Sequence, residues 1–136
     1  MPLKLFPYNN VLTAIELTIT LPNNPGALAR TSDMLRAADV NIEALSCTEG
    51  PTKTLVHLVL DDPETAKIVL RPMSEVVETE IIAYKVHNKP GAIADLARKC
   101  AGAGINIKHI YATSLGKEAM CYVDVDDLEK AKKALK

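Results

Sequence analysis

The sequence contains no tryptophan and only five other aromatic residues, one phenylalanine and four tyrosines, in 136 positions. So few aromatic side chains argue against a surface on which nucleic-acid bases stack and against an aromatic ligand pocket. Lysine and arginine number 16 against 17 aspartate and glutamate residues, which gives a formal net charge of −1. Because proteins that bind polyanions need a positive surface, this balance predicts neither nucleic acid nor an anionic membrane as a partner.

Cysteine is also scarce. Cys47, Cys100 and Cys121 are far apart, and the closely spaced pairs typical of zinc sites and thiol-exchange motifs are absent. We interpret the three residues as reduced core residues of a cytoplasmic protein. No run of residues approaches the ~18 apolar positions of a membrane helix, and the first residues lack the pattern of a signal peptide. The expected location is therefore the cytoplasm, with no membrane partner.

The sequence does contain an internal repeat. Residues 23–29 (NNPGALA) return as residues 88–94 (NKPGAIA), 65 positions later. The same shift aligns residues 16–71 with residues 81–136 without a gap. A chance match of one short motif would not stay in register over that length. The chain is therefore predicted to consist of two copies of one structural unit.

Each copy shows the same succession of patterns. Apolar and polar residues alternate over residues 15–21, which is typical of a strand with one buried face. After the Pro-Gly pair the apolar spacing changes to three and four, which predicts a helix. Residues 40–47 and 53–60 then predict two strands joined by a turn. A second helix follows, with Asp62 as its N-cap and Pro63 at its first position.

This order predicts an α+β fold of two ferredoxin-like βαββαβ units, each with an antiparallel four-stranded sheet and both helices on one face. Residues 76–80 and 81–86 are predicted as the last strand of the first copy and the first strand of the second, and the second copy lacks its own last strand. We expect residues 3–6 to fill that edge, within the chain or by exchange with a second copy. The predicted organisation is an N-terminal segment, 1–13, and two domains, 14–80 and 81–136.

The repeated residues suit a zwitterionic ligand. The Asn-x-Pro-Gly motif lies where a strand ends and a helix begins, so the first N–H groups of that helix are free to hold a carboxylate. Gly26 and Gly91 have no Cβ and allow a ligand to approach the backbone closely. Asn41 and Asn106, at the start of the next strand, offer partners for an ammonium or amide group.

These residues also have a structural interpretation. An asparagine before a helix is a common N-cap, and Pro-Gly is a common turn. Asn41 and Asn106 fit equally well as caps of a helix-to-strand bend. Asp124, Asp126 and Asp127 resemble a metal cluster, but capping turns account for them and no histidine or glutamate lies at ligand spacing, so no metal is expected.

No pattern in the sequence predicts an enzyme. The three histidines, His57, His87 and His109, do not occupy matching positions in the two copies. Neither Cys47 nor Cys100 carries the local signature of a catalytic nucleophile. We therefore expect no catalytic residue and no cofactor.

The doubled motif resembles that of tandem ACT-domain proteins. The match rests on the Asn-x-Pro-Gly-Ala segments at 23–27 and 88–92 and on the segments ADVNI at 38–42 and AGINI at 103–107, and it covers roughly residues 14–136. The resemblance implies regulatory modules that bind amino acids at the interface between two ACT units. In that family the loop after strand one and the start of strand two of the facing unit line the site. Carried over, the site residues are Asn23, Gly26, Ala27, Leu28, Asn41 and Ile42 in the first copy and Asn88, Gly91, Ala92, Ile93, Asn106 and Ile107 in the second.

The expected function is that of a stand-alone regulatory protein that senses an amino acid of modest size between ACT domains, forms a homodimer and acts on a metabolic enzyme or another regulator. The alternative is a ligand-independent regulatory or assembly subunit of an amino-acid biosynthetic enzyme. The two loops differ, with Asn24 and Arg30 in one copy and Lys89 and Asp95 in the other. The two sites therefore need not share a ligand, or both be competent.

Overall fold

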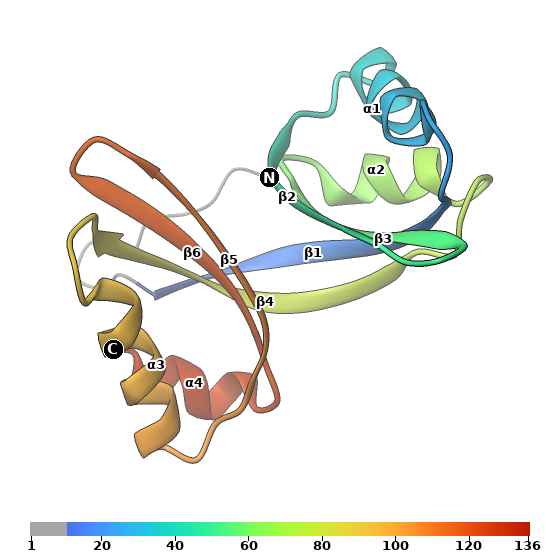
Figure 1. The fold of residues 1–136 in the computed structure, drawn as a ribbon. Coiled ribbons are helices and arrows are strands. Elements are labelled where there is room, and N and C mark those ends of the chain that lie inside the picture. The colour runs from blue at the N-terminus through green and yellow to red at the C-terminus, as the bar shows by residue number, and fades with distance from the viewer. Residues whose placement is uncertain (1–10) are drawn as a thin grey trace. The chain divides into compact units, whose positions relative to one another are not determined.

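The computed structural model describes residues 11–136 (Figure 1). This part of the chain contains six strands and four helices, which confirms the predicted α+β class. The strand predicted at residues 3–6 lies outside the described residues. The elements are, in order, β1 (Val11–Pro22), α1 (Ala27–Ala37), β2 (Ile42–Glu49), β3 (Lys53–Leu60), α2 (Pro63–Leu70), β4 (Val77–His87), α3 (Ala92–Gly102), β5 (Ile107–Leu115), β6 (Glu118–Val125) and α4 (Leu128–Ala134).

The described residues form two compact units. The first unit comprises residues 15–79, and the second comprises residues 80–136 together with 11–14. Two strands therefore contribute to both units. The start of β1 belongs to the second unit, and the start of β4 belongs to the first.

Each unit is built on three strands and on the start of a fourth. In the first, the strands follow the order β2-β3-β1, with the start of β4 next to β1, and β3 pairs antiparallel with both β1 and β2. In the second, the order is β5-β6-β4, with the start of β1 next to β4, and β6 pairs antiparallel with β4 and β5. Figure 1 shows α1 and α2 on one face of the first unit's strands, and α3 and α4 on one face of the second unit's strands.

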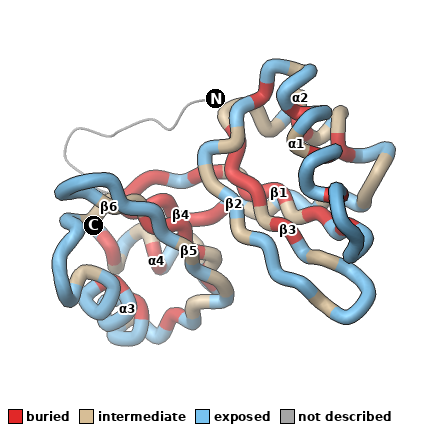
Figure 2. Tube along the Cα trace, turned by 45° about the horizontal axis from the view of Figure 1, so that its top comes forward, coloured by how far each residue is buried: buried red, intermediate tan, exposed pale blue. Residues whose placement is uncertain are grey.

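The alternation in sequence explains the two cores. Leu17, Ile19 and Leu21 of β1 point to the same face of the strand because side chains alternate with period two, and all three are buried. Figure 2 shows buried residues along the strands and on the inner faces of the helices. The first core also contains Leu35, Val56, Leu58, Ala66 and Leu70; the second contains Val11, Ile82, Leu96, Cys100, Cys121, Val123 and Leu135.

The second helix of each unit begins as the sequence predicts. Asp62 caps α2 by accepting hydrogen bonds from the Thr65 hydroxyl at 2.6 Å and the Thr65 N–H at 3.1 Å. Both hydrogen bonds lower the pKa of the Asp62 carboxyl below its ordinary value, and the bond from the Thr65 hydroxyl has the larger effect. Pro63 occupies the first turn, and Asp127 caps α4 by accepting from the Lys130 N–H at 3.1 Å.

Two strands are longer than the sequence pattern indicates. β1 begins at Val11 rather than at residue 15, and the two strands predicted at 76–80 and 81–86 form the single strand β4. No glycine or proline interrupts β4, so the chain has no local reason to turn between the two units. None of the helices in residues 11–136 is both long enough and apolar enough to cross a membrane.

Candidate functional site

The corner between the first strand and first helix of each unit is built around a glycine. Gly26 has φ 87° and Gly91 has φ 90°, both in the left-handed region that favours glycine. Each is the N-cap of the helix that follows, and neither α1 nor α3 has a side-chain cap. The interpretation of Asn23 and Asn88 as N-caps is therefore wrong.

The first N–H groups of α1 and α3 are only partly used. The N–H of Ala27 donates to the carbonyl of Asn24 at 3.4 Å, and the N–H of Ala92 donates to the carbonyl of Lys89 at 3.3 Å. A helix leaves its first four N–H groups without partners inside the helix. Among residues 11–136, the loop and turn hydrogen bonds include no acceptor for the N–H of Leu28 or Ile93. N–H groups at the start of a helix suit an anion wherever the protein's own side chains leave access to them.

The asparagines of the motif tie each corner to the neighbouring hairpin. Asn23 donates from Nδ2 to Oε1 of Glu49 at 2.9 Å and to the carbonyl of Gly50 at 3.0 Å. Asn88 donates from Nδ2 to the carbonyl of Gly116 at 2.9 Å. In each unit the backbone N–H of the asparagine also donates to a carbonyl of the hairpin that its side chain contacts, at 3.3 Å in the first unit and 2.8 Å in the second. The carboxamides therefore hold the loops in place and lie at the mouth of the corner.

The second pair of predicted asparagines lies elsewhere in each unit. The backbone N–H groups of Asn41 and Asn106 donate to the carboxylates of Asp61 and Asp126 at 2.9 Å and 3.0 Å, so at each helix-to-strand bend the capping side chain is the aspartate and the asparagine takes part through its backbone. β2 runs away from this bend, and its far end reaches the hairpin that Asn23 contacts.

Because a strand rises about 3.3 Å per residue, the two asparagines of a unit lie at opposite ends of its sheet. The side chains of Ile42 and Ile107 pack against the cores of their units. Within neither unit, then, does the full predicted set come together.

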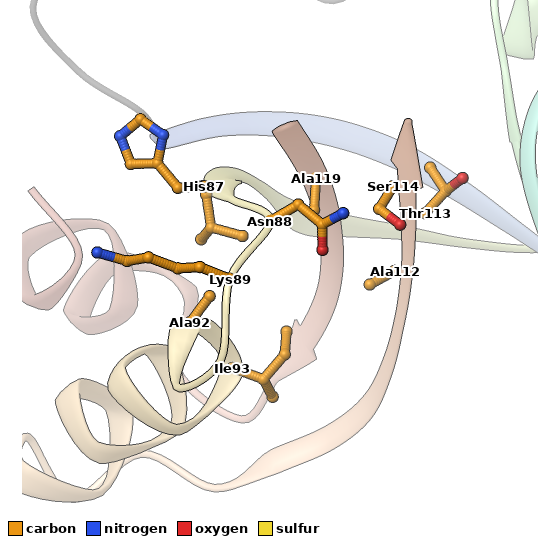
Figure 3. Close-up of a pocket in the computed structure, with 10 residues that line it drawn as sticks. His87, Asn88, Lys89, Ala92, Ile93, Ala112, Thr113, Ser114 and Ala119 are labelled. Carbon is orange, nitrogen blue, oxygen red and sulfur yellow. The ribbon is translucent and has the colours of Figure 1, made fainter. Parts of the chain in front are cut away.

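A pocket of about 160 Å³ lies at the corner of the second unit (Figure 3). Three of the predicted residues line it: Asn88, Ala92 and Ile93. Figure 3 shows the Asn88 carboxamide on the side of the loop that faces β5, where Ser114 lies, whereas the Lys89 side chain extends the other way. Pockets for drug-sized ligands begin at about 300 Å³, so this one suits a molecule of few atoms.

Strand β5 supplies the lining that the sequence reasoning missed. Ala112, Thr113 and Ser114 form the wall opposite the loop. The motif gave no signal for them, because they lie 24 or more positions after Asn88 and their counterparts in the first copy are Cys47, Thr48 and Glu49. Only pairing of β5 with β6 brings this wall beside the corner.

The fold and its two corners define a pair of ferredoxin-like α+β modules. The chain belongs to the ACT domain pair family, whose model matches residues 12–136, and the predicted resemblance to tandem ACT-domain proteins is confirmed. Among curated proteins, none matches the chain.

Several solved structures share this fold. Protein BT0572 from Bacteroides thetaiotaomicron is 23% identical, with a TM-score of 0.86, and the match covers 93% of this chain and 89% of that one. The ligand-free regulatory subunit of aspartate kinase from Thermus thermophilus is 18% identical, with a TM-score of 0.69 and coverage of 90% and 89%. The corresponding subunit from Thermus flavus is 16% identical, with a TM-score of 0.64 and coverage of 93% and 95%.

Proposed function

We propose that the chain is a non-catalytic regulatory module that binds a small amino acid at the corner of its second unit. The observation that carries the proposal is the pocket of about 160 Å³ beside the uncapped start of α3. The N–H of Ile93 and the carboxamide of Asn88 supply donors for a carboxylate, while Ala112, Ala119 and Val86 supply apolar surface for a short side chain.

A regulatory role is supported by membership of the ACT domain pair family and by the fold shared with regulatory subunits of aspartate kinase. In this proposal the pocket is closed by an ACT unit of a second copy of the chain, which makes the active form a homodimer. Ligand binding then favours one arrangement of the units by its higher affinity for that arrangement. The target is a metabolic enzyme or another regulator.

The alternative, a ligand-independent assembly subunit of a biosynthetic enzyme, also has an observation in its favour. The corner of the first unit already holds protein side chains, since Asn23 bonds to Glu49 and the Arg30 guanidinium donates to Asn24 at 3.3 Å. If the second corner were equally unable to take a ligand, the chain would act only as an assembly subunit.

Thermal unfolding in the presence of each proteinogenic amino acid tests the proposal. A ligand at about 100 times its Kd adds about 2.7 kcal/mol to the free energy of unfolding, which raises the Tm by several degrees. For each amino acid that raises the Tm, the corresponding amino-acid amide is the matched control, because it lacks the carboxylate. A screen in which no amino acid raises the Tm contradicts sensing, and a stable complex of the chain with a biosynthetic enzyme would then support the alternative.

A further inference from the structure

The two corners have the same backbone but different occupants. The 65-residue shift places Asn23 on Asn88 and Glu49 on Ser114. In the first unit, a carboxylate oxygen of Glu49 accepts a hydrogen bond from Nδ2 of Asn23 at 2.9 Å. In the second unit the short, neutral Ser114 lies at that place and lines the pocket.

The hydrogen bonds of the two carboxamides show what this difference leaves open. A carboxamide nitrogen carries two N–H groups. Asn23 uses its nitrogen twice, toward Glu49 and toward the carbonyl of Gly50 at 3.0 Å. For Asn88 the described residues provide one acceptor, the carbonyl of Gly116 at 2.9 Å. The second N–H of the Asn88 carboxamide therefore lies at the mouth of the pocket. The equivalent N–H of Asn23 donates to a carboxylate in the first unit.

The backbone at the glycine is also more accessible in the second corner than in the first. A methyl group built on Gly26 would lie 3.1 Å from Nη1 of Arg30, so the guanidinium lies over that glycine. A methyl group built on Gly91 would meet no atom within 4 Å. The residue that replaces Arg30 in the second copy is the shorter Asp95. The first corner is thus covered by the chain's own side chains, and the second is open.

We infer that Glu49 is a built-in occupant of the first corner, and that its carboxylate marks the position of the ligand carboxylate in the second. The inference rests on the proposed function and adds to it a stoichiometry and a mode of binding. Each chain takes one small carboxylate, which accepts a charge-assisted hydrogen bond from the free N–H of Asn88. Ser114 determines that this corner is open, because a glutamate there would fill the same position and repel an anion.

Exchange of the two residues tests the inference on the full chain. The probes are L-alanine, acetate as the bare carboxylate and L-alaninamide as the control without one, and the readout is the side-chain NH₂ and backbone N–H signals in ¹⁵N NMR spectra. In the unaltered protein, L-alanine and acetate are expected to shift the signals of Asn88 and Ile93 and to leave those of Asn23 unmoved. Ser114→Glu should weaken this binding more than about tenfold, which corresponds to about 1.4 kcal/mol. Ser114→Ala is the matched control and should retain it.

Glu49→Ser together with Arg30→Asp gives the first corner the residues of the second and should open it, so that the probes also shift Asn23 and the stoichiometry rises from one to two. Spectra of each variant without probe establish that it is folded. Shifts at both corners of the unaltered protein, a Ser114→Glu variant that still binds, or a Glu49→Ser, Arg30→Asp double variant that gains no second site would each overturn the inference while leaving amino-acid binding intact. No shift at either corner with any carboxylate probe would instead contradict the proposed function itself.

Discussion

Oε1 of Glu16 on β1 lies 3.3 Å from Nδ1 of His57 on the neighbouring strand β3. The side chain of Glu16 is 2% exposed, and Nδ1 of His57 is also 2.9 Å from Oγ1 of Thr18. Taking the polar ring away from a buried carboxyl group is destabilising, because burying a polar group costs free energy unless polar neighbours compensate it. His57→Ala is therefore expected to lower the free energy of unfolding by about 2–3 kcal/mol, measured by urea denaturation.

Thr18→Val is the matched control for His57→Ala, because it removes a hydrogen-bonding hydroxyl next to the same ring and leaves the contact between Glu16 and His57. Its expected cost is about 1 kcal/mol. If the two variants are destabilised equally, the contact between Glu16 and His57 contributes nothing beyond an ordinary hydrogen bond, and the prediction is wrong.

The repeat explains why so much of the fold is predictable from the sequence. The alternation around Leu17 and Ile19 and the caps at Asp62 and Asp127 are local signals, and each appears in the structure where the sequence places it. The length of β1, in contrast, depends on residues far away in the sequence. Val11 is buried because it packs in the core of the second unit, whose other members lie more than 70 residues further along the chain. A period-two pattern cannot reveal such a partner.

The candidate site was predictable to the same extent. The motif located both corners, because Gly26 and Gly91 adopt a backbone that only glycine enters readily. It did not show that Asn23 and Asn88 bond to hairpins instead of capping helices, since those acceptors lie 26 to 28 positions away. The difference between an open and an occupied corner depends on such distant pairs, so the motif alone presents the two copies as equivalent.

The cap of α2 predicts a dependence of stability on pH. Because the folded pKa of Asp62 is lowered, the stability that its ionisation contributes is fully present above the ordinary value of 3.8 and is lost as the pH falls through the folded pKa. Asp62→Asn keeps a capping oxygen without the charge. The difference in urea midpoint between the unaltered protein and Asp62→Asn should therefore shrink between pH 6 and pH 3. A difference that stays constant over this range would show that the charge is not what the cap contributes.

The three cysteines should differ in reactivity. Burial raises the pKa of the Cys100 and Cys121 thiols, so at neutral pH they hold even less thiolate than an ordinary cysteine. Cys47 on β2 is exposed, so the prediction that all three cysteines are core residues is wrong for Cys47. Brief treatment of the folded protein with iodoacetamide should label Cys47 first, as read by peptide mass spectrometry, and all three should react in denaturant. Labelling of Cys100 or Cys121 at the rate of Cys47 would mean that the helices α3 and α4 open readily.

The placement of Val11 can be tested by asking which unit loosens when it is truncated. Val11→Ala removes two buried carbon atoms from the second core and should lower stability by about 2 kcal/mol. Val56→Ala makes the same change in the first core and is the matched control. Because local openings follow cooperative units, hydrogen exchange should rise in α3 and α4 for Val11→Ala and in α1 and α2 for Val56→Ala. If Val11→Ala instead raises exchange in α1 and α2 and leaves α3 and α4 protected, the start of β1 stabilises the first unit, and its assignment to the second is wrong.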